Sequence, residues 1–238
     1  MGRHFEVRAA AMAATAKQKS AIYMRASKEI YMAAKRGVPD PESNLALRSA
    51  IDKYRKSCPK DVIDRAIKKA QGGDVTNYEE GRYEAFGPGN SYLIIDTLSD
   101  NTNRALVNVR TAVTRKGGHL GVVGSVSFNF ELSAVLAFDY AGTEEELEET
   151  LILGDVDVRE ISVEDGKAEV VCEPNDLDKA KELLKGIGVE EYDMAEVTML
   201  ANDKITIEDP EDLRKFKDLL EALDDCEDVQ NVYHNVEL

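Results

Sequence analysis

The chain has 238 residues and a formal net charge of −16, because 46 Asp and Glu outnumber 30 Lys and Arg. Its hydrophobic content of 43% is enough to build ordinary cores, which excludes disordered, collagen-like and coiled-coil classes. Three cysteines without a CxxC pair favour a reducing compartment, and no apolar run is long enough to cross a bilayer. The sequence therefore predicts a cytoplasmic protein without membrane contact, and its net charge alone argues against a nucleic-acid partner.

The charge is divided unevenly along the chain. Residues 1–75 contain 16 Lys and Arg against 8 Asp and Glu, a net charge of +8. Residues 76–238 contain 14 against 38, a net charge of −24. Opposite charge in two halves is typical of a protein whose basic part meets a polyanion while the acidic part stays in solution or binds something else. We therefore expect a nucleic-acid site in the basic part.

Three amphipathic helices are predicted in this basic part. Apolar residues recur at helical spacing over 20–35, over 43–57 and from Pro59 to the Gly72-Gly73 break, and the links between these segments are short. Such a set forms a three-helix bundle behind a basic N-terminal arm. Lys and Arg fall mostly outside the apolar stripes, where they either contact phosphate or form ordinary solvated helix faces.

The pattern changes to short β-rich runs after residue 76. Strands are predicted over 83–86 and 91–98, followed by a helix over 103–116 and a half-buried strand over 125–130. This part of the chain continues after an interruption. Its remaining predicted elements are a strand over 204–207, a helix over 210–223 and a strand over 231–236.

The interruption, residues 131–203, is predicted to be complete in itself. Its strands at 134–140, 158–163, 167–172 and 193–200 and its helices at 143–153 and 176–186 follow the order βαββαβ, which is ferredoxin-like. Thr143 and Glu146 fit a capping box at the first of these helices. The predicted fold is therefore α+β: an N-terminal three-helix bundle followed by two ferredoxin-like (βαββαβ) modules, one inserted in the other. The predicted domains are 1–75, 76–130 plus 204–238, and 131–203.

Several runs of residues resemble the YebC/PmpR family, and the likeness covers essentially the whole chain. These runs are Pro59-Lys60-Asp61-Val62-Ile63-Asp64-Arg65-Ala66-Ile67, Arg82-Tyr83-Glu84-Ala85-Phe86-Gly87-Pro88-Gly89, Asp100-Asn101-Thr102-Asn103-Arg104, Lys116-Gly117-Gly118-His119-Leu120-Gly121 and Gly124-Ser125-Val126-Ser127-Phe128. The opening departs from the family. Members commonly begin with an arm rich in Lys and Arg, whereas this chain has Gly2-Arg3-His4-Phe5 and then the Ala-rich segment 9–16.

The resemblance implies three domains and a cytosolic, non-enzymatic regulator without a cofactor. A DNA-binding transcriptional regulator is the first hypothesis, because the bacterial family is described in this way. The alternative is a ribosome-associated translation factor that binds rRNA and relieves elongation stalls, because related members act in translation. A protein-interaction scaffold without nucleic acid, or an unrecognised enzyme, is a third hypothesis. The acidic domains are candidates for a protein partner, and the chain is expected to be a monomer or a homodimer.

Candidate nucleic-acid-binding residues are the cations of the arm, of the bundle and of the helix over 103–116. They are Arg3, Arg8, Lys17, Lys19, Arg25, Lys28, Lys53, Lys56, Lys60, Arg65, Lys68, Lys69, Arg104, Arg110, Arg115 and Lys116. Phosphate contact needs long cationic side chains on rigid elements, and it needs no sequence-reading motif.

A catalytic or metal site is not indicated by the sequence. His4, His119 and His234 are far apart and form no metal-ligand pattern. The Gly-rich run 117–124 leaves a helix and enters a strand, the reverse of a phosphate-binding loop, so a helix end and a tight turn explain its glycines. It could still present backbone amides to RNA. Phe128 and Phe130 are predicted to lie in the core rather than on an RNA-binding platform.

Overall fold

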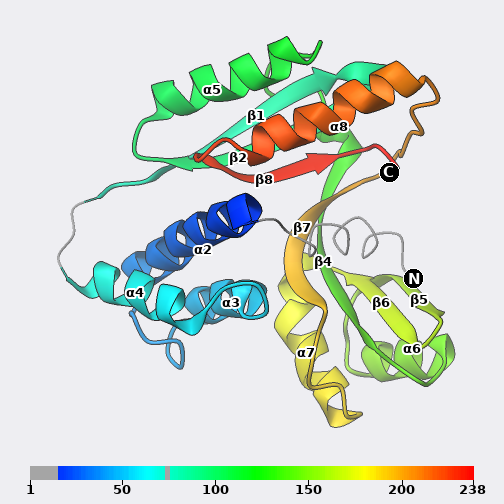
Figure 1. Cartoon of the computed structure of the whole chain (residues 1–238). Coiled ribbons are helices and arrows are strands. Elements are labelled where there is room, and N and C mark those ends of the chain that lie inside the picture. Colours follow the sequence, from blue (N-terminus) through cyan, green and yellow to red (C-terminus); the bar gives the residue numbers. More distant parts are fainter. Residues whose placement is uncertain (1–15, 73–75) are drawn as a thin grey trace. The chain divides into compact units, whose positions relative to one another are not determined.

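The computed structural model describes residues 16–72 and 76–238 (Figure 1). These residues fall into two compact units. One unit is Leu132–Met199, and the other combines Leu200–Leu238 with the described chain that precedes Leu132. The division into three domains stays a prediction, because the helical bundle and the first α/β elements share one unit.

Three helices form the bundle: α2 (Ala16–Arg36), α3 (Leu45–Tyr54) and α4 (Lys60–Gln71). Their apolar stripes meet in one core, in which Ile30 and Leu47 are fully buried. Asn44 caps α3, since its Oδ1 accepts a hydrogen bond from the Leu47 backbone N–H at 3.1 Å. Because the apolar side chains are turned into this core, most Lys and Arg side chains of the bundle are left outside it.

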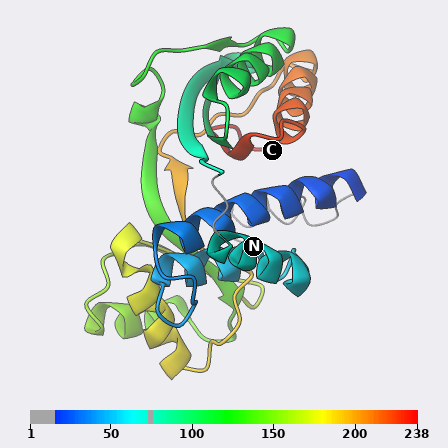
Figure 2. The same cartoon turned by 90° about the vertical axis from the view of Figure 1, so that its left-hand side faces the viewer.

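An antiparallel sheet carries two helices, α5 (Thr102–Arg115) and α8 (Pro210–Asp224), side by side on one face (Figures 1 and 2). Its strands, in spatial order, are β3 (His119–Leu120), β1 (Glu79–Gly87), β2 (Ser91–Ser99) and β8 (Val229–His234). Val109 of α5 and Phe216 of α8 are fully buried in the core between helices and sheet. The β1–β2 turn requires Gly89, which has a φ of 66° and no room for a Cβ beside Ile207.

The order of elements in this sheet differs from the predicted βαββαβ. Strand β1 lies between β2 and β3, where the ferredoxin-like order would place the strand predicted over 204–207. The β1–β2 hairpin pairs over its full length, from Glu79 with Ser99 to Gly87 with Ser91, and so occupies that edge of β2. Residues 204–207 contribute an isolated bridge, Ile205 with Val236. The α+β class is confirmed, and the order of the first module is corrected to ββαβαβ.

The inserted unit has the predicted ferredoxin-like order. Its elements are β4 (Phe130–Asp139), α6 (Glu144–Leu153), β5 (Val158–Glu164), β6 (Lys167–Cys172), α7 (Leu177–Gly186) and β7 (Met194–Ala201). The strands lie in the order β5-β6-β4-β7. Phe138 and Leu147 are fully buried between sheet and helices. The predicted capping box is present, because the side chains of Thr143 and Glu146 each accept from the other's backbone N–H.

Residues 125–130 do not form the predicted strand. Ser127–Asn129 make a short 3-10 turn, η3, and the strand β4 begins only at Phe130. An earlier start is prevented because two backbone N–H groups of this segment donate to the Glu84 carboxylate instead of to a neighbouring strand. Phe130 is buried as predicted, but the prediction for Phe128 is wrong, since its side chain is 68% exposed.

Candidate nucleic-acid interface

The predicted cations differ in where the structure places them. Arg3 and Arg8 lie outside the described residues, and Lys17 lies in the first turn of α2. The exposed cations of the set are Lys19, Lys56, Lys60, Arg65, Lys68, Lys69, Arg104, Arg110 and Arg115. Arg25, Lys28, Lys53 and Lys116 are partly buried.

Helix α4 carries four of these exposed cations within one short helix. They are Lys60, Arg65, Lys68 and Lys69. Ile63 and Ala66 anchor the opposite side of the helix in the bundle core, so the cations are held on a rigid element. Arg65 makes an ion pair with Asp61 at 2.7 Å, but both side chains are largely exposed, and such pairs contribute little. The pair therefore leaves the Arg65 guanidinium available at the surface.

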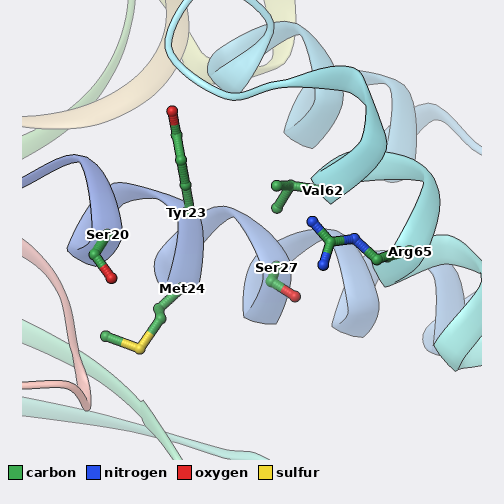
Figure 3. Close-up of a pocket in the computed structure, with 6 residues that line it drawn as sticks. All are labelled: Ser20, Tyr23, Met24, Ser27, Val62 and Arg65. Carbon is green, nitrogen blue, oxygen red and sulfur yellow. The ribbon is translucent and has the colours of Figure 1, made fainter. Parts of the chain in front are cut away.

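A shallow hollow of about 260 Å³ lies between α2 and α4 (Figure 3). It is lined by Ser20, Tyr23, Met24 and Ser27 of α2 and by Val62 and Arg65 of α4. Figure 3 shows the Arg65 guanidinium directed toward α2. The hollow thus places a cation beside serine hydroxyl groups, a combination that suits a phosphate oxygen.

Helix α5 and the loop after it form a second surface without carboxylates of its own. Residues 101–130 contain no Asp or Glu, whereas they contain three Arg and one Lys. Arg110 and Arg115 are exposed on α5, while Val109 and Val113 of the same helix are fully buried. Arg115 lies in the last turn, where the helix dipole favours a cation. The segment therefore supplies cations and no carboxylate of its own, and Asp218 of the neighbouring helix α8 pairs with Lys116 at its end.

The loop between β3 and β4 is fixed by hydrogen bonds to the buried side chain of Glu84. Its Oε1 accepts a hydrogen bond from Gly124 N at 2.7 Å, and its Oε2 accepts from Val126 N at 2.6 Å and from Ser127 N at 2.9 Å. Glu84 is 6% exposed. Three backbone N–H groups that converge on one oxygen pair form an anion-binding concavity, and the chain fills this concavity with its own carboxylate. The loop is therefore held in one shape.

The same hydrogen bonds keep Glu84 ionised. Burial by itself would raise the pKa of this carboxyl, but the hydrogen bonds from Val126, Gly124 and Ser127 outweigh it and hold the pKa below its ordinary value. The contribution of Glu84 to stability is therefore complete above the unfolded pKa and is lost as the pH falls through the lower folded value.

Glu84→Gln is expected to loosen this loop and to lower the free energy of unfolding by about 2 kcal/mol. The amide would place a donor N–H₂ group against backbone donors, and one oxygen position would be lost. Amide hydrogen exchange at Gly124, Val126 and Ser127 should become faster, together with a lower denaturation midpoint. Glu79→Gln is the matched control, because Glu79 lies exposed on the same strand. Unchanged exchange in the Glu84 variant would contradict the anchoring role.

Three of the predicted cations are engaged inside the protein, around the buried carboxylate of Asp228. Arg104 donates to both oxygens of Asp228, at 2.9 and 3.0 Å, and Lys28 lies 3.4 Å from Oδ1. Arg25 pairs with Asp224 at 2.8 Å and donates to the Val229 carbonyl oxygen at 3.0 Å. These contacts join α2 and α5 to the end of α8 and the start of β8. We call Arg25, Lys28, Arg104, Asp224 and Asp228 the Asp228 cluster.

Two further predicted cations also meet carboxylates of this chain. Lys53 lies 3.1 Å from Glu29, which also accepts a hydrogen bond from the Tyr54 hydroxyl at 2.7 Å. Lys116 lies 3.3 Å from Asp218 of α8. The structure therefore brings Arg25, Lys28, Lys53 and Lys116 together with internal acceptors. In contrast, Lys60, Lys68, Arg110 and Arg115 are exposed and make no ion pair with a carboxylate of the described residues.

Sequence reasoning missed Glu84, Asp228 and the outward position of Phe128. Glu84 and the N–H groups that it binds are about 40 positions apart, and Asp228 meets cations 124 and 200 positions away. No local pattern reports pairs of such separation. The one usable signal is Glu84 itself, a charged residue between aromatic and apolar neighbours in a predicted strand.

His119 and His234 lie within residues 16–72 and 76–238, which the structure describes. There, no three His, Cys, Asp or Glu side chains are grouped so that they could hold a metal ion. His119 stacks on Phe86, with ring centroids 5.0 Å apart. His234 is held neutral, because burial lowers its pKa to about 4. None of the helices in this part of the chain could span a membrane.

The acidic charge is concentrated in two segments of the chain. Residues 131–203 contain 22 Asp and Glu against 5 Lys and Arg, and residues 204–238 contain 11 against 4. Residues 76–130 contain 5 of each kind. The net charge of −24 after residue 75 is therefore a property of the inserted unit and the C-terminal segment, while β1, β2 and α5 belong to an electrically balanced segment.

These elements define a protein in which a basic helical bundle and an α/β sheet belong to one compact unit, and an acidic ferredoxin-like unit interrupts it in sequence. The chain belongs to the TACO1/YebC family. The family profile described as "TACO1/YebC protein N-terminal domain" matches residues 3–73, and the profile "TACO1/YebC second and third domain" matches residues 78–236. The family resemblance predicted from the sequence is therefore confirmed.

Two relatives show how closely the chain follows this family. It is 48% identical, over 240 residues and the whole length of both chains, to the probable transcriptional regulatory protein Mfl546 of Mesoplasma florum. Its fold is similar to the crystal structure of the conserved hypothetical protein Aq1575 of Aquifex aeolicus, with a TM-score of 0.77 and 33% identity. That similarity covers 92% of this chain and 90% of the other.

Proposed function

We propose that this protein is a DNA-binding transcriptional regulator that acts in the cytoplasm without a catalytic step. The name of the Mesoplasma florum relative, a probable transcriptional regulatory protein, supports the regulatory role. The observation that carries nucleic-acid binding is the set of four exposed cations on α4. Exposed cations held on a rigid helix are what a phosphate backbone requires.

The proposed interface has two parts. The first consists of the cations of α4, with Arg65 beside the hollow in Figure 3. The second consists of Arg110 and Arg115 on α5. The predicted cations of the Asp228 cluster contribute to the fold in this proposal, because their charges are already matched by carboxylates and carbonyl oxygens. The acidic inserted unit stays away from phosphate by repulsion.

Binding measurements on three targets at one salt concentration test the function. The full chain is mixed with duplex DNA from a regulated promoter, with random duplex DNA and with ribosomes, at about 0.15 M salt, since affinities without a salt concentration have no meaning. We expect tighter binding to promoter DNA than to random DNA. Retention on ribosomes together with weak, sequence-indifferent DNA binding would overturn the transcriptional role and support the ribosome-associated alternative.

A further inference from the structure

The sheet of the inserted unit is buried on both faces, and the unit's own helices account for only one of them. On β4, the side chains of Ala134, Leu136 and Phe138 pack with α6 and α7 in one core. The alternate residues Val135 and Ala137 point to the other face, as side chains do along a strand. Both are nevertheless buried. This other face, which we call the second face, is therefore covered by chain other than α6 and α7.

Strand β6 continues the second face and adds a carboxylate to it. Val171 pairs with Val135, and Glu169 pairs with Ala137, so these two residues of β6 lie on the same face. Both are buried. The three apolar residues of the second face belong to none of the hydrophobic clusters that the described residues form. The chain that covers them is therefore to be sought outside the described residues.

The charge of the inserted unit favours a cationic occupant. Asp and Glu outnumber Lys and Arg by 22 to 5 over residues 131–203. The two cations of its strands are matched within the unit, since Arg159 pairs with Glu173 at 2.5 Å and Lys167 pairs with Asp193 at 2.6 Å. A carboxylate on a buried face is best accommodated when a cation lies beside it. A second copy of this acidic unit would instead be repelled.

Residues 1–15 have the composition and the length that the second face requires. They contain Arg3 and Arg8 against one acid, Glu6. Their apolar side chains recur at helical spacing, with small ones among them: Phe5, Ala9, Met12 and Ala13. Fifteen residues span about 22 Å as a helix and about 50 Å when extended, whereas four strands are only about 14 Å across.

We propose that residues 1–15 dock on the second face of the inserted unit, with their apolar stripe against Val135 and Val171 and with Arg8 beside Glu169. Arg8 is chosen because it follows Phe5 by three positions and so lies next to the stripe on a helix. The inference is independent of nucleic-acid binding. In it, Arg8 is matched inside the protein, as the cations of the Asp228 cluster are, and is withheld from phosphate.

A photo-crosslinking residue, p-benzoylphenylalanine, in place of Phe5 of the full chain tests the docking. On illumination it bonds to neighbouring C–H groups, and mass spectrometry of the digested protein locates the bond. We expect crosslinks to β4 and β6 of the same chain. A mixture of isotopically light and heavy protein distinguishes crosslinks within one chain from those between two copies.

Charge variants of the crosslinking protein test the ion pair. Arg8→Glu and Glu169→Gln are each expected to lower the crosslink yield roughly 5- to 30-fold, because loss of one buried ion pair shifts a docking equilibrium by about this factor. The matched controls are Lys19→Glu, at an exposed position of α2, and Glu145→Gln, at an exposed position of α6. Both controls should keep the yield of the crosslinking protein. The melting temperature of each variant checks its fold.

Trypsin gives a second measurement that needs no unnatural residue. Cleavage after Arg8 should be slower in the wild-type protein than in a free peptide of residues 1–15, because a docked segment is shielded from the protease. Glu169→Gln should make this cleavage faster, and Glu145→Gln should not. Equal rates in the wild-type protein and in the peptide would contradict docking.

Three crosslinking results would overturn the proposal. They are crosslinks to the bundle or to α5, crosslinks only between light and heavy chains, and no crosslink to the inserted unit. Equal loss of yield in Arg8→Glu and Lys19→Glu would show that overall charge, rather than a pair of Arg8 with Glu169, holds the segment, and would overturn the assigned pair.

Discussion

Glutamine in place of the four cations of α4 is expected to weaken nucleic-acid binding roughly 100- to 1,000-fold at about 0.15 M salt. The positions are Lys60, Arg65, Lys68 and Lys69. Each phosphate contact releases a condensed counterion, so loss of four contacts should also reduce the slope of log affinity against log salt by roughly 3 to 4. Titrations at several salt concentrations, with duplex and single-stranded probes, measure both effects.

A second quadruple variant separates lost contacts from lost net charge. Glutamine at Lys179, Lys185, Lys204 and Lys217 removes the same charge from places outside the proposed interface. We expect this variant to bind almost as the wild type does. Equal weakening by both variants would show that overall charge, rather than α4, governs binding. The melting temperature of the α4 variant checks its fold, since Lys69 also lies over the Tyr31 ring at 5.3 Å.

Asp228→Ala is expected to lower the free energy of unfolding by about 3 kcal/mol. The Asp228 side chain is 2% exposed and accepts from Arg104 through both oxygens. Its removal leaves the ammonium group of Lys28, with its side chain 15% exposed, without the nearby carboxylate. Chemical denaturation measures the loss, and Asp228→Asn should cost less because one oxygen acceptor remains.

The Asp228 cluster also predicts a pH dependence. Burial would raise the pKa of Asp228, but the hydrogen bonds from Arg104 and the nearby charges lower it below its usual value. Its stabilising contribution is therefore complete above the unfolded pKa of about 3.9 and is lost as the pH falls through the folded value. Below about pH 4, the stability of Asp228→Asn should fall less steeply than that of the wild type.

Glu227→Gln is the control for both Asp228 experiments. Glu227 is the exposed neighbour in sequence, and its contact with Lys28 uses the backbone carbonyl oxygen, which the substitution keeps. We expect its free energy of unfolding, and the fall of that free energy at acid pH, to match those of the wild type. A Glu227 variant as unstable as Asp228→Ala would mean that general charge in this turn, rather than the buried ion pair, stabilises the structure.

Regular elements were predictable because their signals are local. The apolar spacing of α4 and the Thr143–Glu146 capping box report on neighbours within one or two turns, and both are present. The order βαββαβ of the inserted unit followed from the alternation of such signals. The position of β1 in its sheet could not be predicted in this way, because strand order depends on which hairpin forms. The pairing of Glu79 with Ser99 is not visible in the sequence of either strand alone.

The candidate site was predictable only in part, for a related reason. Helical spacing shows that Arg25 and Lys28 lie off the apolar stripe, but it cannot show that Asp224 and Asp228 meet them there. The alternation of apolar and polar residues over 125–130 predicted a strand there, and in a strand the Phe128 side chain would point into the core. In the structure, the backbone N–H of Val126 donates instead to the carboxylate of Glu84, 42 positions away, and is not available to a neighbouring strand.

The Asp228 cluster has a consequence for how the chain is made. Synthesis proceeds from the N-terminus, so Arg25 and Lys28 emerge long before Asp224 and Asp228, from which they are separated by 199 and 200 positions. Until those residues leave the exit tunnel, the cations of α2 have no partner in the Asp228 cluster and β8 is missing from the edge of β2. A chain without Asp224 and Asp228 would therefore expose more unmatched positive charge on α2 than the folded protein does.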